Sequence, residues 1–362
     1  GQDREVPLYP IREPDMKILH FSINDSTFIR IDREILERHF QTRNYKINTT
    51  SPAAYFFALA RLIFFLLLNG RGYEAYYIRF ADWHSAIIAF FGRLYRRKFY
   101  MVIGGFDVAS IPQFNYGAHR DPLRSRMIKY AMKHATCLLP NSESMIYYEN
   151  RFIREEVTYG GIRYFFPGIR TRIEVVPNGF DHNRYMQLPG IEKQQLAMTV
   201  AAIDGLRAFR IKGIDRFIET AKQLPGYEFL IVGISAGFMD QMGIPIPANL
   251  RTMGYTATEE LIRLYSGASV FCLFSLSEGS PNALCEAMLC ECIPVGTDVT
   301  SIPGIIGDTG FVIRQNIQQA YTENVLMAFD ADKNMGKAAR RRIAEKYSLE
   351  QRERKIISLL SG

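Results

Sequence analysis

Two glutamates, Glu278 and Glu286, lie eight positions apart in SEGSPNALCEAM (277–288), directly after the apolar run SVFCLFS. Ser280 is a favoured N-cap residue and Pro281 a favoured first helical residue, so the sequence predicts a helix that begins there. Glu278 would then lie in the loop ahead of the helix and Glu286 within it. A spacing of eight fits one helical face poorly, whereas a loop acid and a helix acid can converge on one ligand.

The predicted helix start between these glutamates suits a phosphate group. A helix N-terminus offers unpaired backbone N–H groups and a partial positive charge. A diphosphate bound at the amides of Asn282, Ala283 and Leu284 would place one glutamate near each end of a nucleotide-sugar. The alternative is a solvated helix that happens to carry two acids.

The elements that must position these residues follow from an alternation of short apolar runs and amphipathic stretches. KILHFSI (17–23) is typical of a strand and FIRIDREILERHF (28–40) of a helix, and the alternation restarts at MTVAAI after RIEVVPNGFD (172–181). Two such series predict an α/β protein with two parallel-sheet, Rossmann-like domains. Because open parallel sheets bind ligands beyond the carboxyl ends of their strands, we expect a site in the cleft between the domains.

The Pro-Asn-Gly turn at 177–179 separates the two series and sets the predicted domain limits. We expect a leader over 1–15, an N-terminal domain over 16–176, a C-terminal domain over 177–345, and a C-terminal helix over 346–362 that could pack back on the N-terminal domain.

Composition is that of a folded protein, since 48% of the 362 residues are apolar and 22% are charged. The formal net charge is +7, and the basic excess lies in residues 1–180, whereas the remainder is close to neutral. A basic N-terminal half could meet anionic lipid headgroups, phosphorylated substrates or nucleic acid.

The expected location is cytoplasmic. Five cysteines, an odd number in a long chain, argue against a disulfide scaffold and for a reducing compartment. No charged segment followed by an apolar one opens the chain, so no signal peptide is expected.

The most apolar run, AAYFFALARLIFFLLL (53–68), contains Arg61 and is shorter than the roughly 20 residues that span a bilayer. We interpret it first as a buried core helix. A membrane-facing helix on a basic domain is the alternative.

Four segments together resemble one enzyme family. EGSPNALCEAMLCECIPV resembles the E-x7-E signature of the retaining glycosyltransferases of family 4, which have the GT-B fold. VVPNGFD resembles their I-P-N-G-V-D linker and RAFRIKGID their R-x4-K-G segment, and TMGYTATEELIRLYSGASVFCLFS is similar to the stretch that precedes their signature. The resemblance covers nearly all of residues 172–350, whereas the N-terminal half is similar only in the order of its strands and helices.

The resemblance implies a role for each matching residue. Glu278 would bind hydroxyls of the donor sugar, Glu286 would hold the ribose, and Arg207 and Lys212 would clamp the diphosphate, with Arg210 as the alternative to Arg207. Backbone atoms around MGYT would recognise the base. The further donor-binding candidates are Gly279, Ser280, Pro281, Asn282, Ala283, Leu284, Gly254 and Tyr255.

The N-terminal half departs from the family where many members carry a histidine after the fourth strand. Here the segment reads VIGGFDVASIP, so Gly104 and Gly105 occupy the turn and could approach a ligand closely. Asp107, or His119 in NYGAH, could assist the acceptor hydroxyl. The alternatives are a turn-forming aspartate and a surface histidine whose hydrogen bonds are satisfied.

The resulting hypothesis is a metal-independent, retaining hexosyltransferase that needs no cofactor beyond its donor, a UDP- or GDP-sugar. The acceptor would be a glycan or lipid-linked glycan bound by the basic domain, in polysaccharide or glycolipid synthesis, with the protein at the inner face of an anionic membrane. One alternative is a nucleotide-sugar epimerase. Another is a non-catalytic membrane or nucleic-acid adaptor, although no nucleic-acid motif occurs and we expect no nucleic-acid partner.

Overall fold

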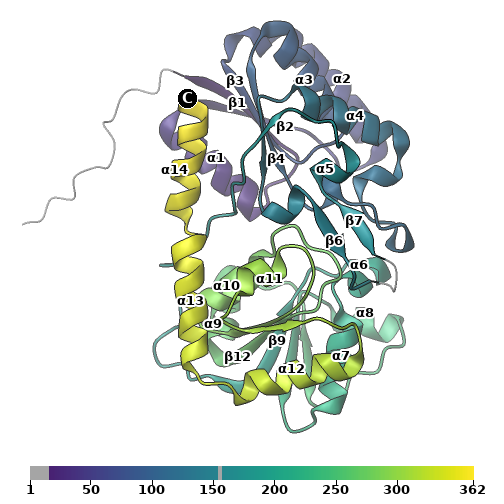
Figure 1. Ribbon diagram of the computed structural model, residues 1–362, viewed down its shortest axis with the longest axis vertical. Helices are drawn as coiled ribbons and strands as arrows, with labels where there is room; N and C mark the ends of the chain where they lie inside the picture. The colour runs from purple at the N-terminus through teal and green to yellow at the C-terminus, as the bar shows by residue number, and fades with distance from the viewer. Residues whose placement is uncertain (1–15, 154–156) are drawn as a thin grey trace, which may run out of the picture.

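The computed structural model describes residues 16–153 and 157–362, which form two parallel-sheet domains, one above the other (Figure 1). The predicted fold class, two Rossmann-like domains, is therefore confirmed. The predicted leader over 1–15 lies outside the described residues.

The N-terminal domain contains a six-stranded parallel sheet with the order β2-β1-β3-β4-β5-β8. A separate antiparallel hairpin, β6-β7, follows β5. Its elements are β1 (Lys17–Ser22), α1 (Thr27–His39), β2 (Gln41–Lys46), α2 (Pro52–Asn69), β3 (Ala75–Arg79), α3 (Trp83–Tyr95), β4 (Lys98–Ile103), α4 (Pro122–His134), β5 (Cys137–Pro140), β6 (Tyr148–Asn150), β7 (Thr158–Gly160), α5 (Ile162–Phe165) and β8 (Arg172–Ile173).

Helices cover both faces of this sheet because alternate strand residues point to opposite sides. On one face, Tyr76 and Ile78 of β3 belong to an apolar cluster with residues of α2, α3 and α4. On the other face, Ala75 and Tyr77 belong to a cluster with residues of α1 and of the last helix, α14 (Leu349–Ser361). The end of the chain thus completes the core of the first domain.

The interpretation of 53–68 as a buried core helix is wrong. Only Ala58, Leu62 and Leu66 of α2 are buried, one stripe at a spacing of four. Phe57 and Leu68 keep 66% and 68% of their surface exposed. The composition of this segment predicts an apolar helix. It does not predict how many other elements cover that helix, because this depends on the fold.

The C-terminal domain has its own six-stranded parallel sheet with the order β11-β10-β9-β12-β13-β14. The strand predicted at MTVAAI begins earlier, since β9 starts at Gln194. The elements are β9 (Gln194–Val200), α6 (Leu206–Ile211), α7 (Ile214–Gln223), β10 (Glu228–Val232), α8 (Ala236–Gln241), β11 (Leu250–Met253), α9 (Thr258–Gly267), β12 (Ala268–Leu273), α10 (Asn282–Leu289), β13 (Ile293–Thr297), α11 (Ile302–Ile306), β14 (Phe311–Ile313), α12 (Gln318–Asp330), α13 (Asn334–Lys346) and α14.

The chain crosses between the domains twice, first near Phe180 and again near Ser348. The two crossings are joined by backbone hydrogen bonds. Phe180 N–H donates to the Tyr347 carbonyl (2.9 Å), and Leu349 N–H donates to the Phe180 carbonyl (3.1 Å). The C-terminal helix expected over 346–362 is α14, and it begins after Ser348, whose side chain caps it by accepting from Gln351 N–H. As Figure 1 shows, α13 lies along the C-terminal domain and α14 continues up the side of the N-terminal domain.

Candidate active site

Lys212 and Glu278, 66 positions apart in the chain, form an ion pair at the top of the C-terminal sheet. Lys212 Nζ lies 2.6 Å from Glu278 Oε1. The Ser275 hydroxyl donates to the same oxygen at 2.7 Å. The Glu278 side chain is only 10% exposed, whereas that of Lys212 is 33% exposed. The pair therefore presents a fixed carboxylate beside a cation that a ligand can reach.

Gly213 brings Lys212 to this position. Its φ of +67° lies in the left-handed region, and a Cβ here would come within 2.1 Å of the Phe274 carbonyl oxygen. Only glycine lets the junction of α6 and α7 rest on the backbone beyond β12. Lys212 thus supplies the cation, and Gly213 allows the backbone conformation that places it.

Arg207 and Arg210 lie on α6, and both are exposed. Arg207 acts electrostatically on Tyr116, whose phenol pKa is raised by burial, by Glu278 and by Asp107, and is lowered in part by Arg207. Arg207 and Glu278 thus both influence the pKa of Tyr116, and within the described part of the chain Arg210 is not among the main influences on it. Tyr116 was missed from the sequence, because a tyrosine in an irregular loop carries no spacing signal.

The two domains meet at Gly105 and Gly279, next to Glu278. A Cβ on Gly105 would lie 2.9 Å from Gly279 N, and one on Gly279 would lie 2.6 Å from Gly105 N. A Cβ on Gly104 would lie 2.6 Å from the Phe80 ring. The Gly-Gly turn after β4, expected to approach a ligand, here approaches the loop that carries Glu278. Any group bound at Glu278 is therefore near the N-terminal domain.

The helix α10 begins one residue later than predicted. Pro281, not Ser280, is the N-cap residue, and no side-chain hydrogen bond caps the helix. Its first hydrogen bond runs from Cys285 N–H to the Pro281 carbonyl, at 3.4 Å. The amides of Asn282, Ala283 and Leu284 precede that bond, so they are the groups a helix leaves without intrahelical acceptors. Ser280 lies instead on the wall of a separate interdomain cavity of about 320 Å³.

Glu286 lines an interdomain cavity of about 130 Å³ formed with α1, the first crossing and α14. Burial raises the pKa of Glu286 to about 7, although the neighbouring Tyr185 and Tyr265 and the charge of Arg184 oppose the shift. Among the described residues, Glu278 does not line this cavity. The expected convergence of both acids on one ligand therefore stays a prediction.

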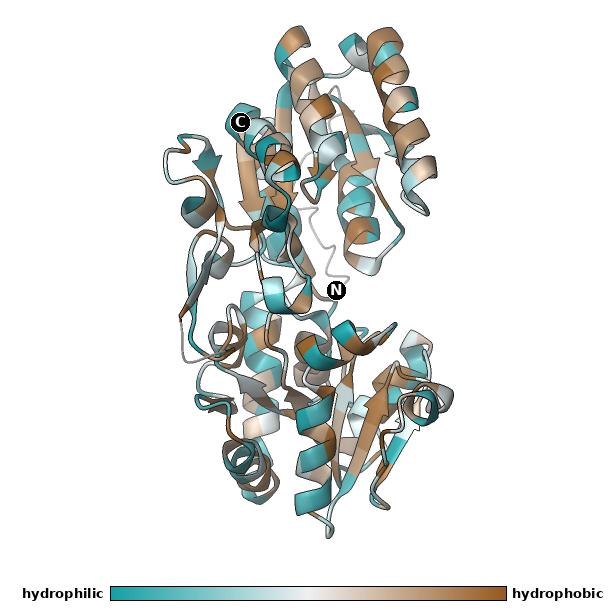
Figure 2. Ribbon diagram, turned by 90° about the vertical axis from the view of Figure 1, so that its right-hand side faces the viewer, coloured by the Kyte–Doolittle hydropathy of each residue, from teal (hydrophilic) through white to brown (hydrophobic). Residues whose placement is uncertain are grey.

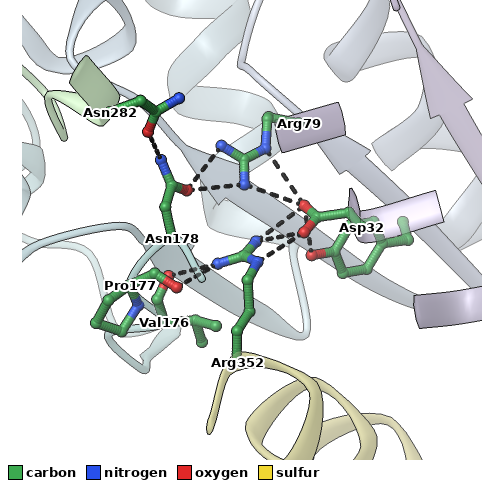
Figure 3. A network of polar contacts seen from close by, with 8 residues as sticks. Asp32, Arg79, Val176, Pro177, Asn178, Asn282 and Arg352 are labelled. Atoms are coloured by element: carbon green, nitrogen blue, oxygen red, sulfur yellow. Dashed lines mark hydrogen bonds and ion pairs between the residues drawn. The ribbon is translucent and has the colours of Figure 1, made fainter. Parts of the chain in front are cut away.

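A buried polar network connects Asp32 of α1 to Asn282 at the start of α10 (Figure 3). Asn178 Nδ2 donates to Asn282 Oδ1 at 3.0 Å, and Asn178 Oδ1 accepts from Arg79 at 3.1 and 3.2 Å. Arg79 and Arg352 both contact Asp32, at 3.1 and 2.7 Å, and all three side chains are nearly fully buried. Burial alone would raise the pKa of Asp32, but Arg352 and Arg79 hold it below its ordinary value.

This network was missed from the sequence, although two signals were present. Asp32 shares the apolar face of its helix with Ile35 and Leu36, three and four residues later. Arg79 ends a strand whose five residues are all buried. Charged residues in such positions are rarely buried without a partner.

Asp107 and His119 have the contacts of a turn former and of a satisfied histidine. Asp107 Oδ2 accepts from Gly104 N–H at 2.8 Å, and the side chain is buried. His119 Nε2 donates to the Asp107 carbonyl (2.8 Å), and Nδ1 accepts from the Ser125 hydroxyl (2.9 Å). Burial lowers the pKa of His119 to about 4, consistent with a neutral ring. Their roles toward an acceptor stay predictions.

Asp107 gives a pH prediction. Burial raises its pKa to about 7, from 3.8. Between these values the folded protein holds a proton that the unfolded chain has lost, so this group destabilises the fold as pH rises. Relative to Asp107→Asn, which keeps an acceptor for Gly104, the wild type should lose up to roughly 1.4 kcal/mol per pH unit between pH 5 and 7. Urea unfolding at several pH values measures this, and a difference that is constant with pH contradicts it.

The remaining candidates follow β11. Gly254 and Tyr255 are exposed, Tyr255 to 96%, and the Gly254 carbonyl accepts from Gly233 N–H at 3.2 Å. They lie at the carboxyl end of a strand, where open sheets bind ligands. Their role in base recognition stays a prediction.

Taken together, the site can bind and stabilise an anion beside a carboxylate. Lys212, Arg207 and the helix amides supply positive charge, while Glu278 supplies an acceptor for hydroxyl groups. The N-terminal domain covers this arrangement at Gly105. Departure of a phosphate leaving group from a hydroxylated substrate is the chemistry that these groups favour.

Known proteins resemble parts of the sequence and the whole fold. Residues 198–330 match the family model for "Glycosyl transferases group 1". The O-antigen chain mannosyltransferase B of Escherichia coli is 35% identical over 83 residues, 23% of this chain and 22% of that protein. The chain therefore matches only about a fifth of this curated relative.

Solved structures match over nearly the whole chain. Sucrose-phosphate synthase from Thermosynechococcus elongatus has a TM-score of 0.72 and 16% identity, covering 96% of this chain and 98% of the other. Anabaena HepE in complex with UDP and glucose has a TM-score of 0.68 and 15% identity, covering 96% and 99%. The chain has the GT-B fold.

Proposed function

We propose that this GT-B chain is a retaining glycosyltransferase that moves a hexosyl group from a nucleoside-diphosphate sugar to a glycan or lipid-linked glycan. The observation that carries the proposal is the Lys212 to Glu278 contact of 2.6 Å at the interdomain face. The group 1 family match over 198–330 supports it. Polysaccharide synthesis is the proposed setting, as the name of the mannosyltransferase relative suggests.

In the proposed reaction, Lys212 and Arg207 stabilise the diphosphate as the glycosidic bond breaks. Negative charge develops on the leaving group, and fixed cations in a partly enclosed site stabilise that charge without reorganising. In this role the two side chains do the work that a metal ion does in other transferases. The amides at the start of α10 would add to the same effect.

Glu278 would bind hydroxyls of the transferred sugar. Its contacts with Lys212 and Ser275 fix one oxygen, and the carboxylate has further acceptor positions. The negative charge can also stabilise the positive charge that builds on the sugar ring as the bond breaks. Glu286, in its own cavity, would be reached by the ribose.

A screen of donors tests the proposal first. HepE is described with UDP and glucose, and the curated relative is named a mannosyltransferase, so UDP-glucose and GDP-mannose are the leading probes. A donor that binds only the folded protein raises the melting temperature. At a donor concentration of 100 times Kd, binding adds about 2.7 kcal/mol to the free energy of unfolding. No shift with UDP-, GDP- or ADP-sugars at millimolar concentration would contradict a nucleotide-sugar donor.

The identified donor then separates transfer from epimerisation. A transferase should release the nucleoside diphosphate faster when an oligosaccharide acceptor is added, with the new linkage in the anomeric configuration of the donor. An epimerase would convert the donor to its isomer without acceptor. Proton NMR of the anomeric signals distinguishes these outcomes, and conversion without acceptor would overturn the proposal.

A further inference from the structure

We propose that the face formed by α2, α3 and α4 docks on an anionic lipid bilayer. We call it the acid-free face, because none of these three helices contains an aspartate or glutamate. They lie side by side on the N-terminal domain, on the side opposite α1 and α14.

The outer surface of α2 is apolar. Six large apolar side chains of this helix are exposed, namely Phe56, Phe57, Ile63, Phe64, Leu67 and Leu68. They recur at a helical spacing opposite the buried stripe of Ala58, Leu62 and Leu66. Figure 2 shows the hydrophobic colour along most of this helix, at the upper right of the molecule. Exposed patches of this kind mark protein or membrane contacts.

An apolar groove continues this surface toward the cleft. Its volume is about 420 Å³, and it is lined by Leu59 and Ile63 of α2, by Trp83 and Phe90 of α3, and by Met127 of α4, among others. Helices in parallel sheets begin at the carboxyl edge of the strands, so Trp83, the first residue of α3, marks the cleft end of the groove. Acyl chains of the adjacent leaflet fit this apolar lining.

The charge of the face favours an anionic bilayer over a second protein surface of the same kind. Exposed cations surround the apolar residues, including Arg61, Arg93, Arg126, Lys129 and Lys133. Asp82 and Asp121, which directly precede α3 and α4, are engaged as helix caps, and Asp82 also pairs with Arg124. A second copy would bring these cations together, whereas anionic headgroups neutralise them.

The helix lies on the membrane in this proposal and does not cross it. By length and composition, Pro52–Gly72 would be able to span a membrane. However, Leu62 and Leu66 pack fully buried in the domain core, and the Tyr55 hydroxyl bonds to His84 Nδ1 at 2.7 Å. An apolar outer face, flanking cations and a packed inner face are the properties of an interfacial helix.

The test is flotation of the full chain with vesicles, without donor or acceptor. We expect binding to vesicles of phosphatidylcholine with 30% phosphatidylglycerol, and at least tenfold weaker binding to phosphatidylcholine alone or in high salt. The variant Phe57→Gln/Phe64→Gln/Leu68→Gln should lose at least tenfold. These side chains are exposed, so its melting temperature should stay near that of the wild type.

The matched control carries three glutamines in place of exposed apolar residues of the C-terminal domain, Ile246, Ile317 and Met327, and should bind like the wild type. No vesicle binding by the wild type, or equal binding by the first triple variant, would overturn the proposal. So would a stable dimer that the first variant dissociates, because the occupant would then be a second copy. Since no sugar transfer is measured, failure here leaves the proposed activity untouched.

Discussion

Lys212→Met should reduce the rate of sugar transfer by at least about 100-fold, the usual effect of removing one group that stabilises transition-state charge. The methionine keeps the length of the side chain but removes the cation 2.6 Å from Glu278. The loss should fall mainly on kcat, because charge on the leaving diphosphate develops only as the bond breaks. Steady-state kinetics with the donor identified by thermal shift measures it.

Lys222→Met is the matched control, because Lys222 is an exposed lysine of the neighbouring helix α7 whose one ion pair among the described residues is with Glu219, at 3.0 Å. It should transfer sugar at the wild-type rate. Glu278→Gln should reduce transfer by a comparable factor, since it removes the carboxylate while preserving size. Wild-type rates from both the Lys212 and the Glu278 variants would remove the site from the proposed reaction.

Asp32→Ala should destabilise the protein by about 3 to 5 kcal/mol, the usual result of leaving a buried charge without its partner. Arg79 and Arg352 would then face each other with no carboxylate between them, although both side chains are almost completely buried. The variant should unfold at much lower urea concentration. If it remains folded at low temperature, transfer should also fall, since Arg79 holds Asn178 against Asn282.

Glu34→Gln provides the comparison on the same helix. Glu34 is 55% exposed and pairs with Arg30 at 3.6 Å, four positions earlier. Exposed pairs of this kind contribute about 0.3 to 0.5 kcal/mol, so the urea midpoint should hardly move. An Asp32→Ala protein within 1 kcal/mol of the wild type would show that the two arginines find other acceptors.

The order of strands and helices could be predicted from the sequence because it depends on neighbours in the chain. The helix expected over 28–40 spans Thr27–His39, and the strand expected over 17–23 spans Lys17–Ser22. The periodicity of apolar residues predicts local secondary structure, and these local elements are present in the fold. The start of α10 is one residue later than predicted, because the ends of a helix are less strictly determined by the sequence than its interior.

Contacts between distant segments could not be predicted in this way. No spacing rule connects Arg352 to Asp32, or Gly105 to Gly279, because the members of each pair lie far apart in the chain. The exposure of α2 depends likewise on which helices the fold lays against it. The proximity of Lys212 and Glu278 was anticipated only through a family resemblance, whereas the geometry that the resemblance implied for Glu286 and Glu278 as a pair stays a prediction.

The return of α14 to the first domain has a consequence for biosynthesis. Arg352 leaves the ribosome 320 residues after Asp32. Once β8 has completed the N-terminal sheet at Ile173, a further 179 residues must be made before Arg352 appears. At about 5 to 20 residues per second, the sheet face that α14 will cover therefore stays open to solvent for roughly 9 to 36 seconds. During that interval, of the two arginines that contact Asp32 in the finished fold, Arg79 is present and Arg352 is not, and Ile356 and Leu360 have yet to enter the core. The domain that is translated first is thus completed only when the end of the chain has been made. Before that, its uncovered apolar sheet face is a surface that a chaperone would bind.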